Sequence, residues 1–477
     1  MDHVNRIKMR KGELFSVGLF FFAACPGFCH PATKQPNVVF IISDQHNANA
    51  LGCYGNKEVS TPNLDKLAGK GVVFQNAFCQ TGQCVPSRYS IWTGRYARST
   101  GTYSNGTGQN PGENTVGDLF KKAGYKTATI GKHHMQMNPA NQNHGFDLVL
   151  NPNGHKKPFN PLPVEEVSPG RSEVGESPLP NEEHTCGLVS TNAIRFIREN
   201  RDNPFVLWCS FQGPHTPITP SAPWSRQYDP EKLTLPPNHH SVDEQMPGVG
   251  GLIRKSGKYS KEIYHLQTLA FYYGLVSQID YNIGLVMEEL DKLGLTENTI
   301  IVYTADHGEM MSEHRAWTKG MTGYDATIRV PLIVSDGKQF SGGKKMNDLV
   351  CSIDLLPTLL YLSGLEIPGN IQGKILTGLM NDNKNWREYA FSEIGSSSLT
   401  SVITVRGKTQ KYVLFRRNGE TEYEQLFNLV TDHWETTNLA GDPKSGDVLK
   451  MMRTVLADWE NATEKAEPVK STGNVEE

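Results

Sequence analysis

Residues 37–43 read NVVFIIS, and Asp44 and Gln45 follow directly. A continuous apolar run rich in β-branched residues is typical of a strand that is buried on both faces of a parallel sheet. Ligands of open α/β sheets collect at the carboxyl ends of the strands, which is where Asp44 stands. This stretch therefore predicts a parallel sheet with a candidate site at one edge.

Strand and helix patterns alternate along the chain beyond this first strand. Thr61-Pro62 provides a helix cap and a first-turn proline, and Leu64 and Leu67 belong to an apolar helical stripe. Such alternation favours an α/β fold with a large mixed, mostly parallel central sheet flanked by helices. Further strands are expected at 72–78, 127–130, 205–211, 299–304 and 330–334, and further helices at 116–123, 191–200, 266–290 and 352–362.

The helix expected at 266–290 has an apolar stripe that only Asp280 interrupts. A hydrogen-bonded core carboxylate is the preferred interpretation of Asp280, ahead of a catalytic one.

The pattern changes in the polar segment 381–387. Beyond it, 402–405 and 412–415 resemble a hairpin, and a strand near 425–428 and a C-terminal helix follow. We therefore predict a leader at 1–35, a catalytic domain at 36–380 and a smaller C-terminal α+β subdomain at 381–477.

The N-terminus has the order of an export signal. Four basic residues between positions 6 and 11 precede the apolar run 14–24, LFSVGLFFFAA, which is too short to span a bilayer. A periplasmic or secreted protein is expected, and a buried N-terminal helix is the less favoured alternative. Phe22-Ala23-Ala24-Cys25 loosely resembles a lipobox, so lipid anchoring through Cys25 stays open. No second stretch approaches the length of a membrane-spanning helix.

The composition is that of an ordinary globular protein, with 37% hydrophobic and 20% charged residues and a formal net charge of -3. Charges of both signs are mixed, and no basic block indicates nucleic-acid binding. The six cysteines beyond the leader lack the dense spacing of a disulfide framework, and no bridge is predicted.

Side chains that can bind a metal ion or transfer a proton follow several of the expected strands. Asp44, Gln45, Asp306 and His307 offer carboxylate, amide and imidazole ligands, a mostly hard set that favours calcium or magnesium. Helix capping is the alternative for each aspartate taken alone. The groups that follow expected strands are Asp44-Gln45, Lys132-His133-His134, Pro214-His215 and Asp306-His307.

The segment Cys84-Val85-Pro86-Ser87-Arg88 carries a further signal. Pro86 favours the first turn of a helix, which places Cys84 at a helix N-terminus where amide dipoles stabilise an anion. Arg88 lies one turn further on. A buried structural cysteine is the alternative interpretation.

Together these motifs resemble the formylglycine-dependent, type I sulfatases of the alkaline-phosphatase superfamily, whose maturation signal is Cys-x-Pro-Ser-Arg. The resemblance covers nearly the whole mature chain, and the combination of motifs is specific. Other matching segments are LGCYGN at 51, TPNLDKLA at 61, TGR at 93, GKHH at 131, HGFD at 144, GPHTP at 213, TADHGE at 304, IRVPLIV at 328, DLLPTLL at 354 and YEQLFNL at 423.

The resemblance implies that a formylglycine-generating or anaerobic maturation enzyme oxidises Cys84. It also implies a divalent cation, Ca²⁺ or alternatively Mg²⁺, held by Asp44, Gln45, formylglycine 84, Asp306 and His307. Gln45 replaces the usual aspartate, which removes a negative charge that would bind the cation and repel a sulfate group.

The resemblance further implies a role for each remaining group. Arg88 and Lys132 would hold the nucleophilic hydroxylate and the sulfate oxygens. For Lys132, a solvated surface lysine is the less favoured alternative, and His133 stands where the family usually has tryptophan.

Three groups would move protons. Asp306 would help to deprotonate the attacking hydroxyl, and His215 and Lys319 would protonate or stabilise the leaving alcohol oxygen. His134 would take a proton from the second hydroxyl so that sulfate is expelled.

The expected function is hydrolysis of O-sulfate groups on a polysaccharide or oligosaccharide. One alternative is a phosphonate monoester or phosphodiester hydrolase on the same scaffold, because fold alone does not set the substrate. Another is a noncatalytic carbohydrate-binding protein, which the complete set of reactive residues disfavours. His314 and Arg315 could contact substrate, but structural contacts explain them equally well, and no substrate-binding residue is predicted.

Overall fold

The computed structural model describes residues 35–135, 143–152, 160–161, 173–248, 261–381, 385–463 and 465–469. Cys25 and the predicted leader, apart from Gln35, lie outside these residues, so export and lipid anchoring stay predictions. Among the helices in the described ranges, none combines the length and apolar character that crossing a membrane requires.

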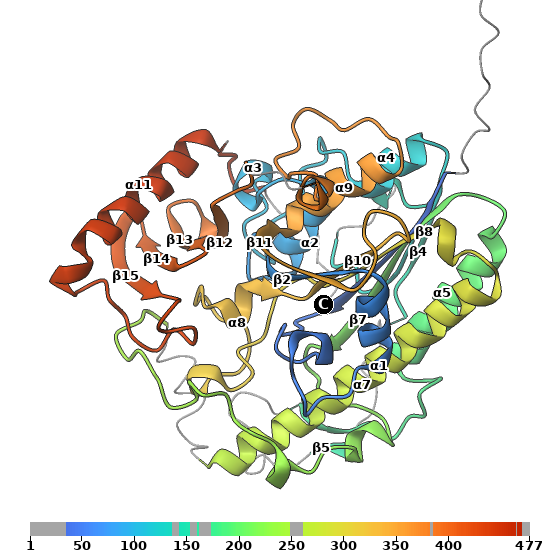
Figure 1. Ribbon diagram of the computed structural model, residues 1–477, viewed down its shortest axis with the longest axis horizontal. Coiled ribbons are helices and arrows are strands. Elements are labelled where there is room, and N and C mark those ends of the chain that lie inside the picture. Colours follow the sequence, from blue (N-terminus) through green and yellow to red (C-terminus); the bar gives the residue numbers. More distant parts are fainter. Residues whose placement is uncertain are drawn as a thin grey trace, which may run out of the picture. The chain divides into compact units, whose positions relative to one another are not determined.

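A mixed sheet forms the centre of the molecule (Figure 1). Its strands within the described residues are β1 (Asn37–Asp44), β2 (Val72–Phe78), β3 (Lys126–Gly131), β4 (Leu148–Leu150), β7 (Phe205–Pro214), β8 (Thr299–Ala305), β9 (Arg329–Val330), β10 (Leu332–Ser335) and β11 (Lys344–Cys351). The order is β11-β2-β10-β8-β1-β7-β3-β4, with β9 beside β2. β1 is parallel to both β7 and β8, whereas β10 is antiparallel to β2 and β8. The predicted mixed, mostly parallel sheet is confirmed.

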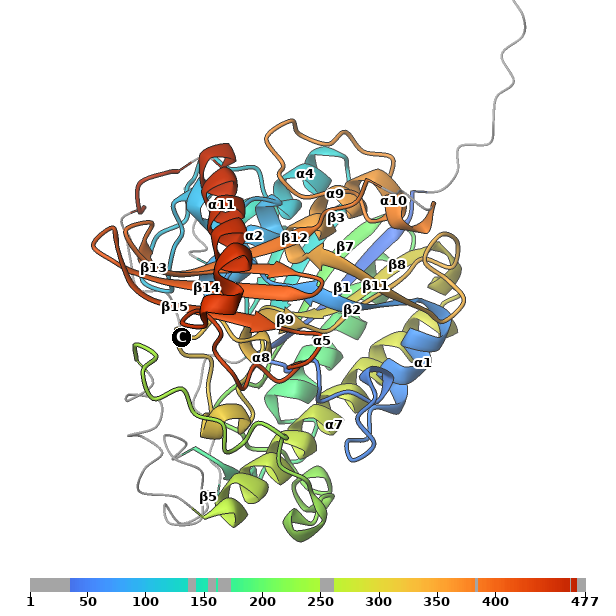
Figure 2. The ribbon, with the colours of Figure 1, turned by 60° about the vertical axis from the view of Figure 1, so that its left-hand side comes forward.

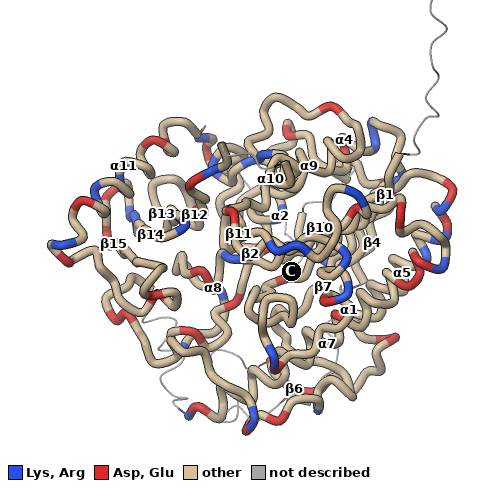
Figure 3. Tube along the Cα trace, viewed as in Figure 1, with Lys and Arg blue, Asp and Glu red and all other residues tan. Residues whose placement is uncertain are grey.

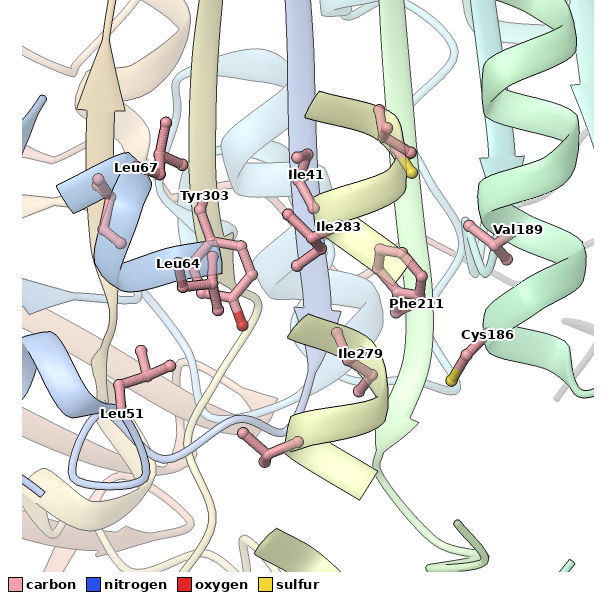
Figure 4. Close-up of a cluster of buried hydrophobic side chains, with 14 of the residues drawn as sticks. Ile41, Leu51, Leu64, Leu67, Cys186, Val189, Phe211, Ile279, Ile283 and Tyr303 are labelled. Carbon is pink, nitrogen blue, oxygen red and sulfur yellow. The ribbon is translucent and has the colours of Figure 1, made fainter. Parts of the chain in front are cut away.

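Helices cover both faces of this sheet, which explains why β1 is apolar throughout. Ile41 belongs to the core on the side of α1 (Pro62–Lys70), α5 (Thr185–Asn200) and α7 (Glu262–Lys292), where Figure 4 shows it beside Ile283 of α7. Phe40 belongs to the opposite core, under the second group of helices. That group contains α2 (Cys84–Thr93), α4 (Val116–Lys122) and α9 (Leu355–Leu362), and the shorter helices are α3 (Ala97–Thr100), α8 (Asp325–Ile328) and α10 (Thr377–Met380).

The N-terminus of α1 is capped from a distant part of the chain. Thr61 precedes the helix as predicted, but its side chain makes no capping hydrogen bond. Instead, Asp280 of α7 accepts hydrogen bonds from the backbone N–H groups of Asn63 at 3.1 Å and Leu64 at 2.7 Å. The interpretation of Asp280 as a hydrogen-bonded core carboxylate is confirmed.

A second, antiparallel sheet forms the C-terminal subdomain. Its strands, in spatial order, are β12 (Tyr389–Ser397), β13 (Thr400–Gly407), β14 (Gln410–Arg417) and β15 (Glu420–Asn428). Helix α11 (Gly446–Ala462) packs on one face (Figure 2), and the other face contacts α8 and the segment that follows β8. An α+β subdomain is thus confirmed, while its boundary at 381 stays a prediction.

Buried ion pairs join this sheet to the rest of the protein. Asp325 of α8 contacts Arg406 of β13 at 3.0 Å and Lys411 of β14 at 2.8 Å. Lys411 also pairs with Glu435, and the Lys411 side chain is fully buried.

The two-residue strands β5 (Asn160–Pro161) and β6 (Gly175–Glu176) form a separate small sheet. All six cysteines in the described ranges are free thiols.

Candidate active site

The predicted site residues gather at the carboxyl edge of the central sheet. Asp44 ends β1, Lys132 follows β3, His215 follows β7 and Asp306 follows β8. These strands are parallel neighbours, so their carboxyl ends meet. Cys84 begins α2 at the same edge.

Four buried side chains form a compact cluster there. The ligand atoms of Asp44, Cys84, Asp306 and His307 all lie within 4.8 Å of one another. The Cys84 Sγ atom is 3.2 Å from His307 Nε2 and 3.7 Å from Asp44 Oδ1. In a matured protein, this sulfur would be replaced by the oxygens of the hydrated aldehyde.

The donor set fits a hard divalent cation. His307 Nδ1 is 2.8 Å from the Gly308 carbonyl oxygen, which can only accept, so Nδ1 carries a proton. In the neutral ring, the Nε2 lone pair would face the cluster. Two carboxylates and this imidazole suit Ca²⁺ or Mg²⁺ once oxygen replaces the thiol.

Gln45 lies at the margin of the cluster with a left-handed backbone, at a φ of 62°. Its backbone N–H donates to Asp306 Oδ1 at 3.0 Å, and its carbonyl accepts from the Tyr272 hydroxyl at 2.8 Å. Its side-chain Oε1 is 3.4 Å from Lys319 Nζ. The amide oxygen thus faces Lys319 Nζ, which also lies 3.0 Å from Cys84 Sγ and 3.2 Å from His307 Nε2.

Positive charges surround the carboxylates. Arg88 donates to Asp306 Oδ2 at 2.8 Å and lies 3.3 Å from Asp44 Oδ2, while Lys132 Nζ is 2.9 Å from the same Asp44 oxygen. Burial alone would raise the pKa of Asp44, but nearby positive charges, led by Lys132, hold that pKa well below its usual range. Elsewhere along the described trace, charges of both signs are interspersed (Figure 3), so the positive field of the site is local.

Two close backbone approaches set the positions of these groups. Gly131, at a φ of 97°, lies against β7 so closely that a Cβ atom would be 1.8 Å from the Ser210 carbonyl oxygen. This crossing directs Lys132 toward the cluster. Gly308 likewise allows the turn that carries Asp306 and His307 to pack on α8, because a Cβ atom at Gly308 would be 2.0 Å from the Ala326 carbonyl oxygen.

Lys319 and His215 face residue 84 together. Lys319 Nζ is 3.0 Å from Cys84 Sγ and 3.4 Å from His215 Nε2. Burial lowers the pKa of His215 to about 3, and its Nδ1 donates to the Thr216 carbonyl at 2.7 Å, so its neutral Nε2 faces the lysine. Burial opposes a charge on Lys319, but Cys84 and Asp44 outweigh it and raise the lysine pKa.

The electrostatics also favour negative charge at position 84. Burial and Asp44 tend to raise the pKa of the Cys84 thiol, but Lys319, His307 and Lys132 together hold that pKa well below its usual value. The site therefore stabilises an anionic atom at this position.

His134 is the predicted residue whose placement is least tied to the cluster. It lies two residues beyond Lys132 at a φ of 62°, and its buried Nδ1 has no hydrogen-bond partner among the described residues. Burial, followed by Arg88, lowers the pKa of the neighbouring His133 to about 4.

His314 makes structural contacts. Its ring stacks on Tyr324 with centroids 4.1 Å apart, and its Nε2 lies 3.1 Å from Asn238 Nδ2. These contacts favour the structural interpretation of His314. Arg315 is half-buried with a left-handed φ of 57°.

Two residues at the site were not predicted from the sequence. Ser210 accepts from Arg88 Nη1 at 2.8 Å and donates to the Lys132 carbonyl at 2.5 Å. A serine within the otherwise apolar start of β7 was the available signal. Glu309 accepts from the Gln45 side-chain amide, and it stands inside the TADHGE segment without a predicted role.

Comparison with known families decides what kind of protein this site belongs to. The family model described as Sulfatase matches residues 36–365. The chain belongs to the sulfatase family. A second model, described as N-sulphoglucosamine sulphohydrolase, C-terminal, matches residues 312–462 of this sulfatase. The resemblance stated from the motifs is confirmed at the level of family and superfamily, and the protein is a sulfatase enzyme.

Individual relatives match over most of this chain and most of their own lengths. The arylsulfatase of Clostridium perfringens is 31% identical over 88% of this chain and 94% of its own length. The ulvan-active sulfatase of Formosa agariphila is also 31% identical, over 86% of this chain and 78% of its own. The solved phosphonate monoester hydrolase from Silicibacter pomeroyi superposes with a TM-score of 0.77 and 26% identity, over 90% of this chain and 96% of its own.

Proposed function

We propose that this sulfatase removes O-sulfate groups from a polysaccharide or oligosaccharide by means of formylglycine at position 84. The observation that carries the proposal is the position of Cys84 Sγ, 3.2 Å from His307 Nε2 and 3.0 Å from Lys319 Nζ. Residue 84 thus faces both a candidate metal ligand and a candidate proton donor, and Lys319 Nζ is itself 3.2 Å from His307 Nε2.

Asp44, Gln45, Asp306 and His307, together with residue 84, would hold Ca²⁺, with Mg²⁺ as the alternative. When bound, the cation would stabilise negative charge, and the aldehyde hydrate would supply the attacking hydroxyl.

Arg88 and Lys132 bring positive charge to the site and contact its carboxylates. Arg88 is fully buried and contacts both Asp44 and Asp306, so it fixes the two carboxylates relative to each other. Lys132 Nζ, 2.9 Å from Asp44, adds a positive charge where sulfate oxygens would collect. Asp306 would also accept the proton of the attacking hydroxyl.

Departure of the sugar alcohol requires a proton donor, because an alkoxide is a poor leaving group. Lys319 is the charged member of the pair that faces residue 84, and the neutral His215 Nε2 lies 3.4 Å away. Lys319 would donate the proton, while His215 would orient it and stabilise the alcohol oxygen. His134 would then accept a proton from residue 84 as sulfate leaves.

The carbohydrate substrate class is supported by the 31% identity to a sulfatase described as ulvan-active. The export signal predicted at the N-terminus agrees with an extracytoplasmic polymer as substrate. We propose a periplasmic or secreted location, with lipidation of Cys25 as the open alternative.

The proposal is tested on protein co-produced with a formylglycine-generating enzyme. Mass spectrometry of the peptide around position 84 should show the aldehyde, and activity on defined sulfated oligosaccharides should rise in proportion to aldehyde content. Full activity in protein that retains the Cys84 thiol would refute the nucleophile. A panel of algal and glycosaminoglycan oligosaccharides tests the substrate class. Activity on aryl sulfates together with no desulfation of any oligosaccharide in this panel would refute it.

Phosphonate monoester or phosphodiester hydrolysis is the second candidate. It is favoured by the superposition with the Silicibacter pomeroyi enzyme at 26% identity. Comparison of kcat/KM for 4-nitrophenyl sulfate and for a 4-nitrophenyl phosphonate monoester separates the two functions. A higher value for the phosphonate would favour this second candidate.

A further inference from the structure

Glu309 contacts the Gln45 side chain at the end that does not face Lys319. It is fully buried, and its Oε2 accepts from the Gln45 side-chain Nε2. Its other oxygen, Oε1, accepts from the backbone N–H of Thr318, the residue before Lys319. The Glu309 backbone carbonyl is held in turn by Asn47 Nδ2 at 2.7 Å. The Glu309 carboxylate thus connects the Gln45 side chain to the segment that carries Lys319.

This contact determines which end of the Gln45 amide faces the site. A side-chain amide has an accepting oxygen on one end and a donating NH₂ group on the other. Glu309 Oε2 accepts from the NH₂ end of Gln45. The Gln45 Oε1 atom is left on the opposite side, 3.4 Å from Lys319 Nζ.

The backbone of Gln45 is already fixed by other contacts. Its φ of 62° lies in the left-handed region, which is unfavourable for a residue with a side chain. Asp306 holds its N–H, and Tyr272 holds its carbonyl. Neither contact distinguishes the two ends of the side-chain amide. Glu309 at the NH₂ end and Lys319 at the oxygen end do so.

We propose that Glu309 is a positioning residue that turns the amide oxygen of Gln45 toward the cation. This inference rests on the proposed cation site. A cation binds the amide oxygen, not the NH₂ group, so loss of the orientation removes a ligand and places a donor against the metal. Partners of metal ligands of this kind typically contribute about 10- to 100-fold to metal affinity.

An exchange of the two side chains provides a specific test. In E309Q, the new amide oxygen can still accept from Thr318 N–H, but its NH₂ group then faces Gln45. Gln45 must turn its own oxygen away from the cation to accept from it. In Q45E, two carboxylates face each other and repel.

The double variant Q45E/E309Q restores every hydrogen bond. The glutamine introduced by E309Q can accept from Thr318 N–H and donate to the carboxylate introduced by Q45E. The second oxygen of that carboxylate remains directed at the cation. A residue that mattered only for packing would give no such rescue.

Ca²⁺ affinity is measured by calorimetric titration of mature protein after chelation, at equal aldehyde content in all variants. We expect E309Q to lose about 10- to 100-fold in affinity and Q45E to bind Ca²⁺ more weakly than the double variant. Q45E/E309Q should reach at least the wild-type affinity, because its carboxylate supplies the negative charge that Gln45 lacks. E313Q is the matched control, because Glu313 is a buried glutamate in the same segment whose Oε2 accepts from Asn238 at 2.9 Å. Its Ca²⁺ affinity should be unchanged.

The possible outcomes distinguish failure of the role inferred for Glu309 from failure of the proposed cation site. Wild-type protein that binds neither Ca²⁺ nor Mg²⁺ overturns the cation site and the role of Glu309 with it. Wild-type binding that E309Q leaves intact overturns the role of Glu309 alone. If E309Q fails to fold, a lack of recovery in Q45E/E309Q relative to Q45E overturns the inference.

Discussion

At the scale of single residues, Lys319 and His215 form the pair that would assist departure of the alcohol in the proposed mechanism. The lysine carries the charge, and the histidine is neutral because burial lowers its pKa to about 3. In the proposed mechanism, Lys319 would therefore be the proton donor.

Lys319→Ala should lower kcat for sugar sulfates by about 100- to 10,000-fold, the usual contribution of general-acid catalysis. The loss should be much smaller for 4-nitrophenyl sulfate, because nitrophenolate leaves without protonation. Steady-state assays of both substrates check this difference, with the exposed Lys338→Ala as control. Equal losses on the two substrates would show that Lys319 acts through binding.

Glu313 provides a pH-dependent contribution to stability. Burial raises its pKa to about 7, so the folded protein binds a proton more tightly there than the unfolded chain does. The associated stability is present below the unfolded pKa of about 4.3 and is lost as the pH rises through 7. Glu313→Gln removes the titration. Relative to wild type, this variant should gain about 2 kcal/mol in free energy of unfolding between about pH 5 and pH 8, measured by urea denaturation. A difference independent of pH would contradict the assignment.

Residues that share a short motif could be predicted from the sequence at this scale. Cys84 and Arg88 lie one helical turn apart, and Asp306 and His307 are adjacent. The contact between Glu309 and Gln45 joins positions 264 residues apart in sequence, so it depends on how β1 and β8 pair. Nothing local to either residue indicates that contact.

At the scale of elements, α1 obtains its N-terminal cap from α7. Asp280 accepts from the N–H groups of Asn63 and Leu64, which otherwise lack a partner within the helix. The pattern of α7 correctly predicted a core carboxylate, but the identity of its partners required the packing of two helices.

Asp280→Ala should lower the free energy of unfolding by about 1 to 3 kcal/mol, because it leaves these buried donors unsatisfied. Urea denaturation measures the loss, and kcat under native conditions should stay close to that of wild type. Thr61→Ser serves as a control, because it keeps the hydroxyl that accepts from Gly52 N–H at 3.0 Å. An undiminished stability in Asp280→Ala would show that water satisfies the α1 terminus.

The strands that could not be predicted correctly from the sequence are those without a continuous apolar run. β11 begins with exposed Lys344 and Lys345 and becomes buried only near Leu349, so it lacks a sustained apolar run. The run expected at 330–334 is divided at Pro331 into β9 and β10. Proline has no N–H to contribute to a ladder, which accounts for the interruption.

At the scale of the whole molecule, the proposed cation site would stabilise the fold as well as support the reaction. Its carboxylates and imidazole lie on β1 and after β8, at the centre of the sheet. An ion that binds only the folded protein raises its stability by mass action, by about 2.7 kcal/mol at 100-fold excess over Kd.

Chelation should therefore lower the Tm by several degrees, and added Ca²⁺ should restore it, as measured by differential scanning calorimetry. Asp306→Ala removes a proposed ligand, so its Tm should not respond to the chelator. A wild-type Tm that is insensitive to chelator at every Ca²⁺ concentration would contradict a cation in this position.

The alternation of strands and helices predicted the architecture of the central sheet, but not the packing of the C-terminal sheet against it. Its attachment depends on Asp325 of α8, which pairs with Arg406 and Lys411. These residues are 81 and 86 positions away from Asp325 in the chain. No periodicity in either segment indicates such a partner.

The placement of α8 has a consequence for recombining sulfatases. This helix packs on Gly308, next to the candidate metal ligand His307, and is ion-paired to the C-terminal strands. A chimera joined near residue 381 would separate Asp325 from Arg406 and Lys411 and leave buried charges unmatched. A crossover upstream of α8, near the start of the C-terminal family match at residue 312, would transfer both halves of this contact together.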